Sequence, residues 1–229
     1  MSIYYRNEDG WIEEYKKKQA FWMHDGNPKR PHALLRSGKH STGFFNSRPI
    51  IADKNLFLQA VSDLIDLYME EGYGIRAIKR VVGPQTGATK MAEFISYEIT
   101  YLNQSSCDWA SPVKLLDGGV AKSMVFDDPN RTVKPGEVVF LCEDVISTGS
   151  SIDLTAKAAI VAGGLVLPYV VALVNRSGLE EIDGRKIFAL INRFMPMWNV
   201  DTGEMCPLCK KGSEALHPKD NWDRFNANY

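Results

Sequence analysis

Short runs of apolar residues alternate along the chain with longer stretches in which apolar residues recur at helical spacing. An apolar run bounded by turn residues predicts a strand buried on both faces, as in a parallel sheet. A broad apolar face at helical spacing predicts a helix that packs on such a sheet. The predicted strands are 77–82, 108–114, 138–142, 165–174 and 187–194, and the predicted helices are 54–71, 89–101 and 152–161. This alternation predicts an α/β fold with a doubly wound parallel sheet.

The N-terminal part and the middle of the chain show weaker patterns. Residues 11–24 mix aromatic and charged side chains, and Trp11, Tyr15 and Trp22 fit helical spacing, so we expect an amphipathic helix there. Its aromatic stripe is more typical of a core or a dimer surface than of a ligand site. Residues 115–133 are long and polar, which predicts a mobile loop or a long hairpin.

The composition is that of one globular domain, or of a domain with appendages. The 229 residues are 45% hydrophobic and 24% charged, with a formal net charge of −1. A charge near zero argues against a nucleic-acid-binding surface. No apolar run approaches the roughly 18 residues of a membrane span, and the N-terminus lacks the apolar core of a signal peptide. We therefore expect a cytoplasmic protein without membrane contact, whose four cysteines are mostly reduced.

The richest chemistry follows the predicted strand at 138–142. Glu143 and Asp144 end this strand in negative charge, and a loop of hydroxyl residues around one glycine leads into the next helix. Backbone N–H groups and hydroxyls at a helix N-terminus suit a phosphate. Carboxylates repel phosphate but suit hydroxyl donors or a hydrated Mg²⁺. A ribose 5-phosphate offers both features, whereas an ordinary turn with a serine N-cap would not need two preceding acids.

The stretch 138–151 resembles the signature of type I phosphoribosyltransferases, which bind 5-phosphoribosyl-1-pyrophosphate (PRPP). The resemblance implies that Glu143 and Asp144 hold the ribose hydroxyls during catalysis. It also implies that the following loop holds the 5-phosphate, through Ser147, Thr148, Gly149, Ser150 and Ser151. The implied fold is a doubly wound parallel sheet with an N-terminal hood and a C-terminal tail.

Residues 33–46 carry a second resemblance, to the N-terminal region of orotate phosphoribosyltransferases. Short apolar pieces flank a basic, glycine-containing turn, which taken alone is more typical of a solvated turn. Orotate phosphoribosyltransferases have a basic residue before Ser-Gly and an aromatic-aromatic-Asn sequence after it. The resemblance implies that Arg36 touches pyrophosphate or base and that Phe44 and Phe45 border the base.

Two further positions gain a role only from the resemblance. The turn 83–90 joins a predicted strand to a helix and lacks the Gly-Lys-Ser/Thr ending of a Walker loop. In type I phosphoribosyltransferases the equivalent turn binds pyrophosphate, which implies that role for Thr86, Gly87 and Ala88. Arg176 ends a predicted strand where the arginine of orotate enzymes meets the substrate carboxylate; the alternative is an ordinary surface arginine.

The chain departs from the family's pattern at two places. Asn175 stands where orotate enzymes have an aspartate before the arginine. The polar segment in the middle of the chain lacks the usual basic cluster, from which a catalytic lysine reaches the neighbouring subunit's site. Lys114, Lys122, Arg131 and Lys134 are scattered there. Lys122 is the candidate for the catalytic lysine, with a plain surface charge as the alternative for each of the four.

Cys206 and Cys209 form a Cys-x-x-Cys sequence near the C-terminus, which is half of a zinc site. Cys107 and His217 would complete it only if the fold happened to bring them there. We expect either a small structural zinc knuckle or a simple turn. A thioredoxin-like redox role lacks its usual sequence setting.

The resemblances together imply a phosphoribosyltransferase domain over residues 1–200, with a hood segment at about 1–50, and a tail at 201–229. The implied reaction, a pentosyl transfer, joins a nitrogenous base to the ribose of PRPP and releases pyrophosphate, with Mg²⁺ as cofactor. Orotate, which yields orotidine 5′-phosphate in pyrimidine nucleotide biosynthesis, is the favoured base, and the family precedent implies a homodimer. A purine or another base, and a non-catalytic PRPP-binding regulator, stay open as alternatives.

Overall fold

A six-stranded sheet forms the centre of the protein in a computed structural model that describes residues 6–35, 37–118 and 120–229. The strand order is β11-β12-β10-β9-β5-β6. All neighbours run parallel except β11, which pairs antiparallel with β12 at one edge. The strands are β5 (Arg80–Val82), β6 (Asp108–Ala110), β9 (Val138–Ile146), β10 (Leu165–Asn175), β11 (Glu181–Ile182) and β12 (Arg185–Asn192).

The order of the parallel strands indicates where a ligand binds. Numbered by their order along the chain, they lie as 2-1-3-4-5, so the winding direction reverses between β5 and β9. In doubly wound sheets, the loops on either side of this reversal diverge and leave a crevice at the carboxyl ends of the strands. The loops after β5 and β9 are the two turns for which the sequence predicts anion binding.

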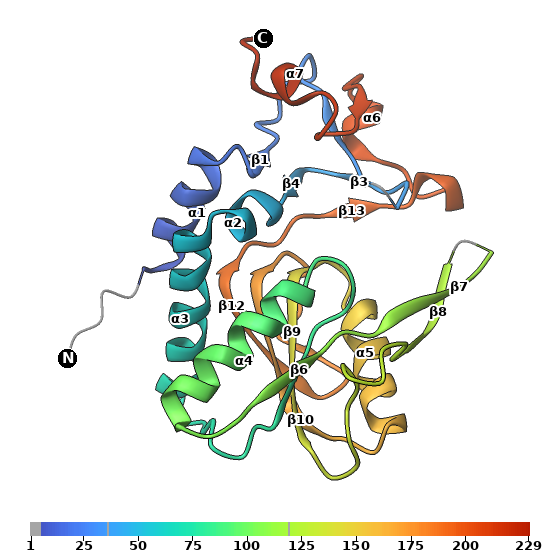
Figure 1. Ribbon diagram of the computed structural model, residues 1–229. Helices are drawn as coiled ribbons and strands as arrows, with labels where there is room; N and C mark the ends of the chain where they lie inside the picture. Colours follow the sequence, from blue (N-terminus) through green and yellow to red (C-terminus); the bar gives the residue numbers. More distant parts are fainter. Residues whose placement is uncertain (1–5, 36, 119) are drawn as a thin grey trace.

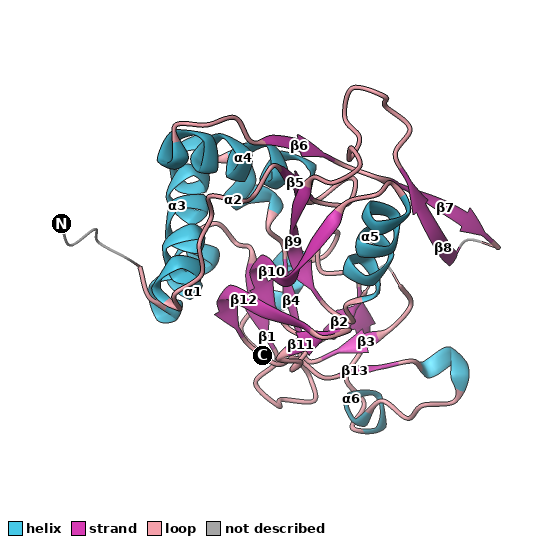
Figure 2. Ribbon diagram, turned by 90° about the horizontal axis from the view of Figure 1, so that it is seen from below, coloured by secondary structure: helices cyan, strands magenta, loops and turns pink. Residues whose placement is uncertain are grey.

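Helices cover both faces of the sheet (Figures 1 and 2). On one face lie α1 (Glu8–Lys17), α3 (Lys54–Glu70) and α4 (Thr89–Asn103), and on the other lies α5 (Ser150–Val161). A large apolar core fills the space beneath the three helices, and a smaller one lies beneath α5. Among the described residues, no helix combines the length and the apolar character that a membrane crossing requires.

The predicted α/β fold is confirmed, although several elements end at different residues. The strand predicted for 138–142 continues to Ile146, because Glu143 and Val145 keep their pairing with β10. The acidic pair is therefore part of the strand and not of the loop after it. In contrast, β5 is shorter than the predicted strand 77–82 and begins only at Arg80.

The helix predicted for residues 11–24 is wrong beyond Lys17. The helix α1 ends there, and Gln19 adopts a left-handed backbone conformation with φ of 53°. The following residues turn back and form the strand β1, so Trp22 lies on a strand and not on the helix. Trp22 matched the helical spacing of the preceding aromatic residues by coincidence.

The hairpin that was one alternative for residues 115–133 is present, although it begins earlier. The strands β7 (Val113–Asp117) and β8 (Val120–Val125) pair antiparallel. Figure 2 shows this hairpin projecting from the body of the molecule. Lys114 lies on its first strand and Lys122 on its second.

A segment of the N-terminal region that begins at Phe21 and the C-terminal segment together build a second layer, which we call the hood (Figure 1). Its four-stranded sheet has the order β13-β3-β2-β14, so C-terminal strands flank an N-terminal hairpin on both sides. The segment 201–229 is thus paired with the N-terminal region, while the predicted domain boundary itself stays a prediction. The hood contains β1 (Phe21–Met23), β2 (His32–Leu34), β3 (His40–Ser41), β4 (Gly43–Phe45), α2 (Arg48–Ala52), β13 (Met197–Trp198), a 3-10 helix (Val200–Thr202), α6 (Pro207–Lys210), β14 (Ala215–Leu216) and α7 (Trp222–Asn226).

Truncation of Phe140 tests the contribution of the larger core. Phe140 lies on β9, is fully buried, and has its ring centroid 4.8 Å from that of Tyr68. Removing a buried phenyl ring loses its transfer free energy and leaves a cavity. We expect Phe140→Ala to lower the free energy of unfolding by about 3–5 kcal/mol, measured by denaturant unfolding.

Phe194→Ala is the matched control, because the Phe194 side chain is 61% exposed. We expect it to change the free energy of unfolding by about 0.5 kcal/mol or less. Equal losses from the two variants would contradict the assignment of Phe140 to the core.

Candidate functional site

Two adjacent carboxylates lie at the carboxyl end of β9. Glu143 is 7% exposed, and Asp144 is half-buried. Oε1 of Glu143 accepts a hydrogen bond from the Asp144 N–H at 3.1 Å. Oδ1 of Asp144 accepts one from the Val145 N–H at 2.9 Å. These bonds orient the two carboxylates side by side at the end of the strand.

The environment of the pair disfavours two negative charges. Burial raises the pKa of Glu143 well above its usual range, and the charge of Asp144 adds to the rise. The positive charge of Lys114 counteracts this rise in part. Strongly shifted carboxyl groups of this kind are concentrated at functional sites, because a ligand or a metal ion compensates the buried charge.

The loop after the carboxylates presents an open helix N-terminus. Gly149 is the N-cap of α5, and no side chain caps this helix in the part of the chain that the structure describes. Gly149 has φ of 80°, and a Cβ there would lie 2.9 Å from Ile182, so both backbone and packing require glycine. The predicted loop residues 147–151 line one small hollow that also reaches Glu143. Their N–H groups, their hydroxyls and the helix dipole suit an anion.

The turn between β5 and α4 lies directly against the acidic pair. A Cβ at Gly87 would lie 2.6 Å from the carboxylate of Asp144, so only glycine permits this approach. The peptide bond between Gln85 and Thr86 is cis. Ala88 is buried, and its N–H donates to the carbonyl of the residue four positions earlier at 3.3 Å. Of the three predicted residues, Thr86 and Gly87 reach the site and Ala88 does not.

The β5–α4 turn and the acidic pair line one cavity of about 360 Å³, which we call the acid-lined cavity, and the loop after β9 contributes Ser151 to its wall. The hairpin β7–β8 and the C-terminal part of the hood each contribute a lysine to its wall. Cations and acids thus line the same space, which suits a ligand that carries both hydroxyl and phosphate groups. The lining residues are Phe45, Asn46, Ser47, Arg48, Pro84, Gln85, Thr86, Gly87, Lys114, Glu143, Asp144, Val145, Ser151 and Lys219.

Three cations of this wall were not selected from the sequence. Arg48 follows the aromatic-aromatic-Asn sequence by two residues, so an extension of that resemblance would have found it. Lys114 was considered, but Lys122 was preferred. Nothing in the local sequence marks Lys219, because its position depends on how the C-terminal segment folds back over the cavity.

Lys122 lies in a different place from the acidic pair of its own chain. It lines a separate cavity between the hairpin and α5, together with Met124 and Leu154. Within one chain, Lys114 lines the acid-lined cavity, and its charge acts on Glu143. The role implied for Lys122 concerns a neighbouring subunit, so that role stays a prediction.

Arg176 is a buried cation held by neutral groups of the hood. Its guanidinium donates to the Gly43 carbonyl at 3.1 Å and to the Ser41 hydroxyl, and the residue is 3% exposed. Its Nε has no hydrogen-bond partner among the described residues. Burial lowers the pKa of Arg176 to about 10, so the group stays charged at neutral pH. The alternative of a surface arginine is therefore wrong, and the buried charge attracts an anion.

The two predicted base-bordering phenylalanines lie on opposite faces of β4, because consecutive strand residues alternate. Phe45 packs on the rings of Tyr15 and Phe21 and borders the acid-lined cavity. Phe44 lines a separate cavity of about 320 Å³ in the hood. The structure therefore does not bring both rings to one ligand. Arg36, the third residue predicted from this region, lies outside the described residues.

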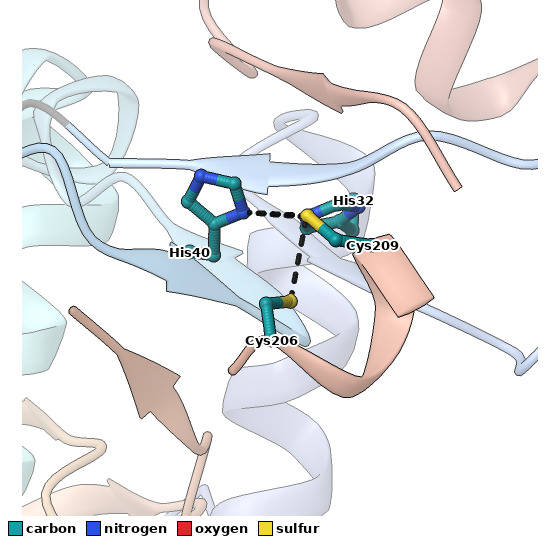
Figure 3. Close-up of side chains that lie close together, drawn as sticks. All are labelled: His32, His40, Cys206 and Cys209. Atoms are coloured by element: carbon teal, nitrogen blue, oxygen red, sulfur yellow. Dashed lines mark hydrogen bonds between the residues drawn. The ribbon is translucent and has the colours of Figure 1, made fainter. Parts of the chain in front are cut away.

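Cys206 and Cys209 lie in the hood, beside His32 and His40 (Figure 3). None of these four side chains lines the acid-lined cavity. The histidines were not predicted as partners, because His32 and Cys206 are 174 positions apart and no spacing pattern connects them.

The completion of this cluster by Cys107 and His217 is wrong. Cys107 belongs to the large core beneath the three helices. The Nδ1 atom of His217 is hydrogen-bonded to the carbonyl of Leu34 at 2.9 Å.

The acid-lined cavity fits a magnesium ion that a phosphorylated ligand brings with it. Carboxylate oxygens are preferred ligands of Mg²⁺, which often keeps several waters and binds through one or two carboxylates and substrate phosphates. Glu143 and Asp144 supply such oxygens. Around them, the helix N-terminus suits one phosphate, and the β5–α4 turn with its neighbouring cations suits a second anionic group.

Comparisons with known proteins agree with this geometry. No family model matches the chain. An orotate phosphoribosyltransferase of Campylobacter jejuni is 30% identical over 197 residues, which cover 82% of this chain and 90% of that protein. The orotate phosphoribosyltransferase of Heliobacterium modesticaldum is 29% identical over 187 residues, which cover 82% of this chain and 88% of that protein.

Solved structures show the same fold at lower identity. The orotate phosphoribosyltransferase of Aeropyrum pernix has a TM-score of 0.54 and 22% identity, over 79% of this chain and 92% of that chain. The adenine phosphoribosyltransferase of Saccharomyces cerevisiae has a TM-score of 0.53 and 17% identity, over 80% of this chain and 99% of that chain. At these identities the structures establish the fold alone.

We expect Glu143→Gln to stabilise the ligand-free protein at neutral pH. The pKa of Glu143 is higher in the folded state than in the unfolded state. The free energy of unfolding therefore falls as the pH rises from the unfolded-state pKa to the folded-state pKa. Each pKa unit between the two states corresponds to a loss of about 1.4 kcal/mol in the free energy of unfolding. Denaturant unfolding should show no advantage of the variant near about pH 4 and a growing advantage towards neutral pH.

Glu137→Gln is the control, for which we expect the opposite change in the free energy of unfolding. Both carboxylate oxygens of Glu137 accept hydrogen bonds from the buried Arg80, at 2.9 and 2.8 Å. Burial alone would raise the pKa of Glu137, but the pairing with Arg80 lowers it, and the resulting pKa lies below its usual value. The ionised Glu137 therefore stabilises the fold above its unfolded-state pKa, and this stabilisation is lost as the pH falls. Glu137→Gln should therefore destabilise at neutral pH. A stability gain in both variants, or in neither, would contradict the assigned environments.

Proposed function

Because this chain belongs to the orotate phosphoribosyltransferase family, we propose that it transfers the 5-phosphoribosyl group of PRPP to orotate and releases pyrophosphate. The product is orotidine 5′-phosphate, an intermediate of pyrimidine nucleotide synthesis. The reaction class is that of a pentosyltransferase.

One observation carries this proposal. An acidic pair lies between an uncapped helix N-terminus and a glycine-containing turn, at the point where the strand order reverses. The pair and the turn line the acid-lined cavity, and the helix N-terminus lines an adjoining hollow that shares Glu143, Val145 and Ser151 with it. PRPP has groups that match all three features, namely a ribose diol, a 5-phosphate and a pyrophosphate. Few other ligands combine a diol with phosphate groups at both of its ends.

The reaction breaks the bond between ribose C1 and a pyrophosphate oxygen and forms a bond between C1 and a ring nitrogen, with inversion at C1. Positive charge develops on the ribose while negative charge develops on the pyrophosphate. Glu143 and Asp144 bind the ribose hydroxyls, and their negative charge stabilises the oxocarbenium-like ring. Residues 147–151 bind the 5-phosphate, so binding energy at that end positions C1 for attack. Orotate is already an anion, so neither carboxylate has to act as a general base.

The leaving pyrophosphate is assigned to the other side of the cavity. Thr86 and Gly87 border it there, and the side chains of Arg48 and Lys114 add positive charge. Mg²⁺ would supply further neutralisation of the leaving group, held through the oxygens of Glu143 and Asp144. The same carboxylates thus keep the metal and the ribose close to each other.

Arg176 is proposed to bind the carboxylate of orotate. Among the described residues, its buried guanidinium has only neutral partners in the hood and one N–H without an acceptor, so a ligand carboxylate would complete its hydrogen bonds. A planar guanidinium and a carboxylate pair through two parallel hydrogen bonds. Adenine and uracil lack this carboxylate, so the contact selects orotate.

A homodimer in the cytosol is the proposed form of the enzyme. In the family, the hairpin lysine reaches the neighbouring subunit's site, and Lys122 lies on the hairpin β7–β8, which projects from the body. Lys122 is therefore proposed to act in the partner's cavity, while Lys114 remains beside the acids of its own chain.

A panel of bases tests the proposed function directly. Purified protein with PRPP and Mg²⁺ is supplied in turn with orotate, uracil, adenine, guanine and hypoxanthine, and pyrophosphate release is followed continuously. We expect pyrophosphate release with orotate, and chromatography should detect orotidine 5′-phosphate.

Asp144→Asn tests the role of the acidic pair. It removes a charge that faces the ribose and should weaken PRPP binding by about 10-fold to 150-fold, equivalent to about 1.5–3 kcal/mol.

The outcomes separate the alternatives. Pyrophosphate release with a purine but not with orotate would show that the enzyme uses a different base. PRPP binding by calorimetry, without release on any base, would identify a non-catalytic regulator. Unchanged PRPP affinity in Asp144→Asn would contradict the role of the acidic pair.

Arg176→Lys tests the base contact separately from PRPP binding. A lysine keeps the charge but loses the planar pair of donors, so kcat/KM for orotate should fall by about 10-fold to 150-fold. The dissociation constant of PRPP should not change, and the preference for orotate over uracil should narrow. Arg193→Lys is the control, because the Arg193 side chain is 44% exposed. If the affinity for PRPP fell by the same factor as kcat/KM for orotate, Arg176 would stabilise the fold and would not bind the base.

A further inference from the structure

Four potential metal ligands converge in the hood, outside the acid-lined cavity (Figure 3). His32 and His40 come from the hairpin β2–β3, and Cys206 and Cys209 come from the turn that begins α6. One atom of each residue (Nε2 of His32, Nδ1 of His40 and the two Sγ atoms) lies within 4.8 Å of all the others. Two imidazoles and two thiols form the donor set of a Cys₂His₂ zinc site.

The distances between the donor atoms resemble the edges of a tetrahedron. With usual zinc bond lengths, the N···N edge is about 3.3 Å and the N···S edge is about 3.6 Å. The two nitrogens are 2.9 Å apart. His32 Nε2 lies 3.6 Å from Cys206 Sγ and 3.5 Å from Cys209 Sγ. His40 Nδ1 lies 3.2 Å from Cys209 Sγ. A single ion at the centre is therefore within bonding reach of all four atoms.

The hydrogen bonds behind His32 direct a lone pair towards this centre. The Ser213 hydroxyl donates to the Arg30 carbonyl at 2.7 Å, so it accepts the hydrogen bond from His32 Nδ1 at 2.9 Å. His32 therefore carries its proton on Nδ1 and a lone pair on Nε2. That lone pair accepts one hydrogen bond, yet His40 and two thiols surround it. A metal ion satisfies all four groups, and zinc-bound histidines typically have such an outer hydrogen bond.

We propose that the hood holds a structural zinc ion, bound by His32, His40, Cys206 and Cys209. Two sulfur and two nitrogen donors in tetrahedral arrangement favour zinc among the common metal ions. Four protein ligands fill the coordination sphere and leave no position for water or substrate, which distinguishes structural from catalytic zinc. His32 and Cys206 are buried, so the ion is enclosed on the side of the hood core.

The hood needs such a link, because its own apolar core is small. The buried apolar residues of that core, among those the structure describes, are Trp22, Ala33 and Phe225. Its sheet consists of strands of two or three residues. Layers with so little buried apolar surface usually depend on a metal ion or a disulfide. The zinc ion ties the N-terminal hairpin to the C-terminal segment, which closes a very long loop of the chain.

The link also bears on the candidate active site. Ser41, next to the ligand His40, accepts a hydrogen bond from Arg176. The C-terminal segment that carries the cysteines also carries Lys219, which lines the acid-lined cavity. The zinc ion thus holds together the two segments that cover this cavity.

Metal analysis of the full chain tests the proposal. Protein is expressed with added zinc and purified without chelator, and any affinity tag is removed. Mass spectrometry of the metals should find one zinc per chain. Cys206→Ser and Cys209→Ser should each lose most of it, whereas the controls Cys107→Ser and His217→Gln should keep it.

A second measurement does not depend on whether the variants fold. Titration of metal-stripped wild-type protein with Co²⁺ should produce the intense visible bands of tetrahedral cobalt and a thiolate charge-transfer band. Chelation should lower the melting temperature of the wild type and of Cys107→Ser by about 10 °C, and added zinc should restore it. The melting temperature of Cys206→Ser should respond to neither treatment.

Three results would overturn the proposal. The first is wild-type protein that contains no zinc and gives no tetrahedral cobalt spectrum. The second is a Cys206→Ser, Cys209→Ser double variant that keeps its zinc. The third is a disulfide between Cys206 and Cys209 in protein purified under reducing conditions. None of these measurements involves PRPP or orotate, so their outcome is independent of the proposed function.

Discussion

The buried carboxyl group of Glu143 is the constraint around which this molecule is arranged. Desolvation opposes its ionisation, so the folded protein carries an energetic cost at this position. The cost is local, because β9 lies inside the sheet and is paired with a neighbour on each side. We propose that a ribose diol or a metal ion offsets this cost. The apolar residues of β9 thus stabilise the fold, while its Glu143 carboxyl group destabilises the fold until a ligand binds.

A buried positive charge lies at the end of the neighbouring strand. Arg176 follows β10, and its guanidinium is directed into the hood, where the Gly43 carbonyl and the Ser41 hydroxyl accept its hydrogen bonds. We propose that these two incompletely satisfied groups are complementary to the two reactants, since one suits the sugar and the other suits an acidic base. Because both belong to adjacent parallel strands, the sheet sets their relative position.

The hood depends on strands from both the N-terminal and the C-terminal part of the chain. Its sheet alternates N-terminal and C-terminal strands, and the His–Cys cluster joins the same two segments. A layer with such short strands gains little from its own core and much from links between distant residues. The hood in turn supplies Ser41 to Arg176 and Lys219 to the acid-lined cavity. Order in the hood is thereby connected to the shape of the candidate active site.

The sequence by itself determined the sheet, the main helices, the acidic pair and the hydroxyl-rich loop that follows it. These features depend on local periodicity and on contiguous residues, such as the run from Glu143 to Ser151, and neighbours in sequence remain neighbours in space. Trp22 shows the limit of local spacing, because strand pairing with β4 overrode the helical pattern. Only the tertiary structure decided that Lys114 and not Lys122 reaches the acids of its own chain, and that His32 and His40 meet Cys206 and Cys209. Those contacts join residues far apart along the chain, and the packing of whole layers, which no local pattern records, brings them together.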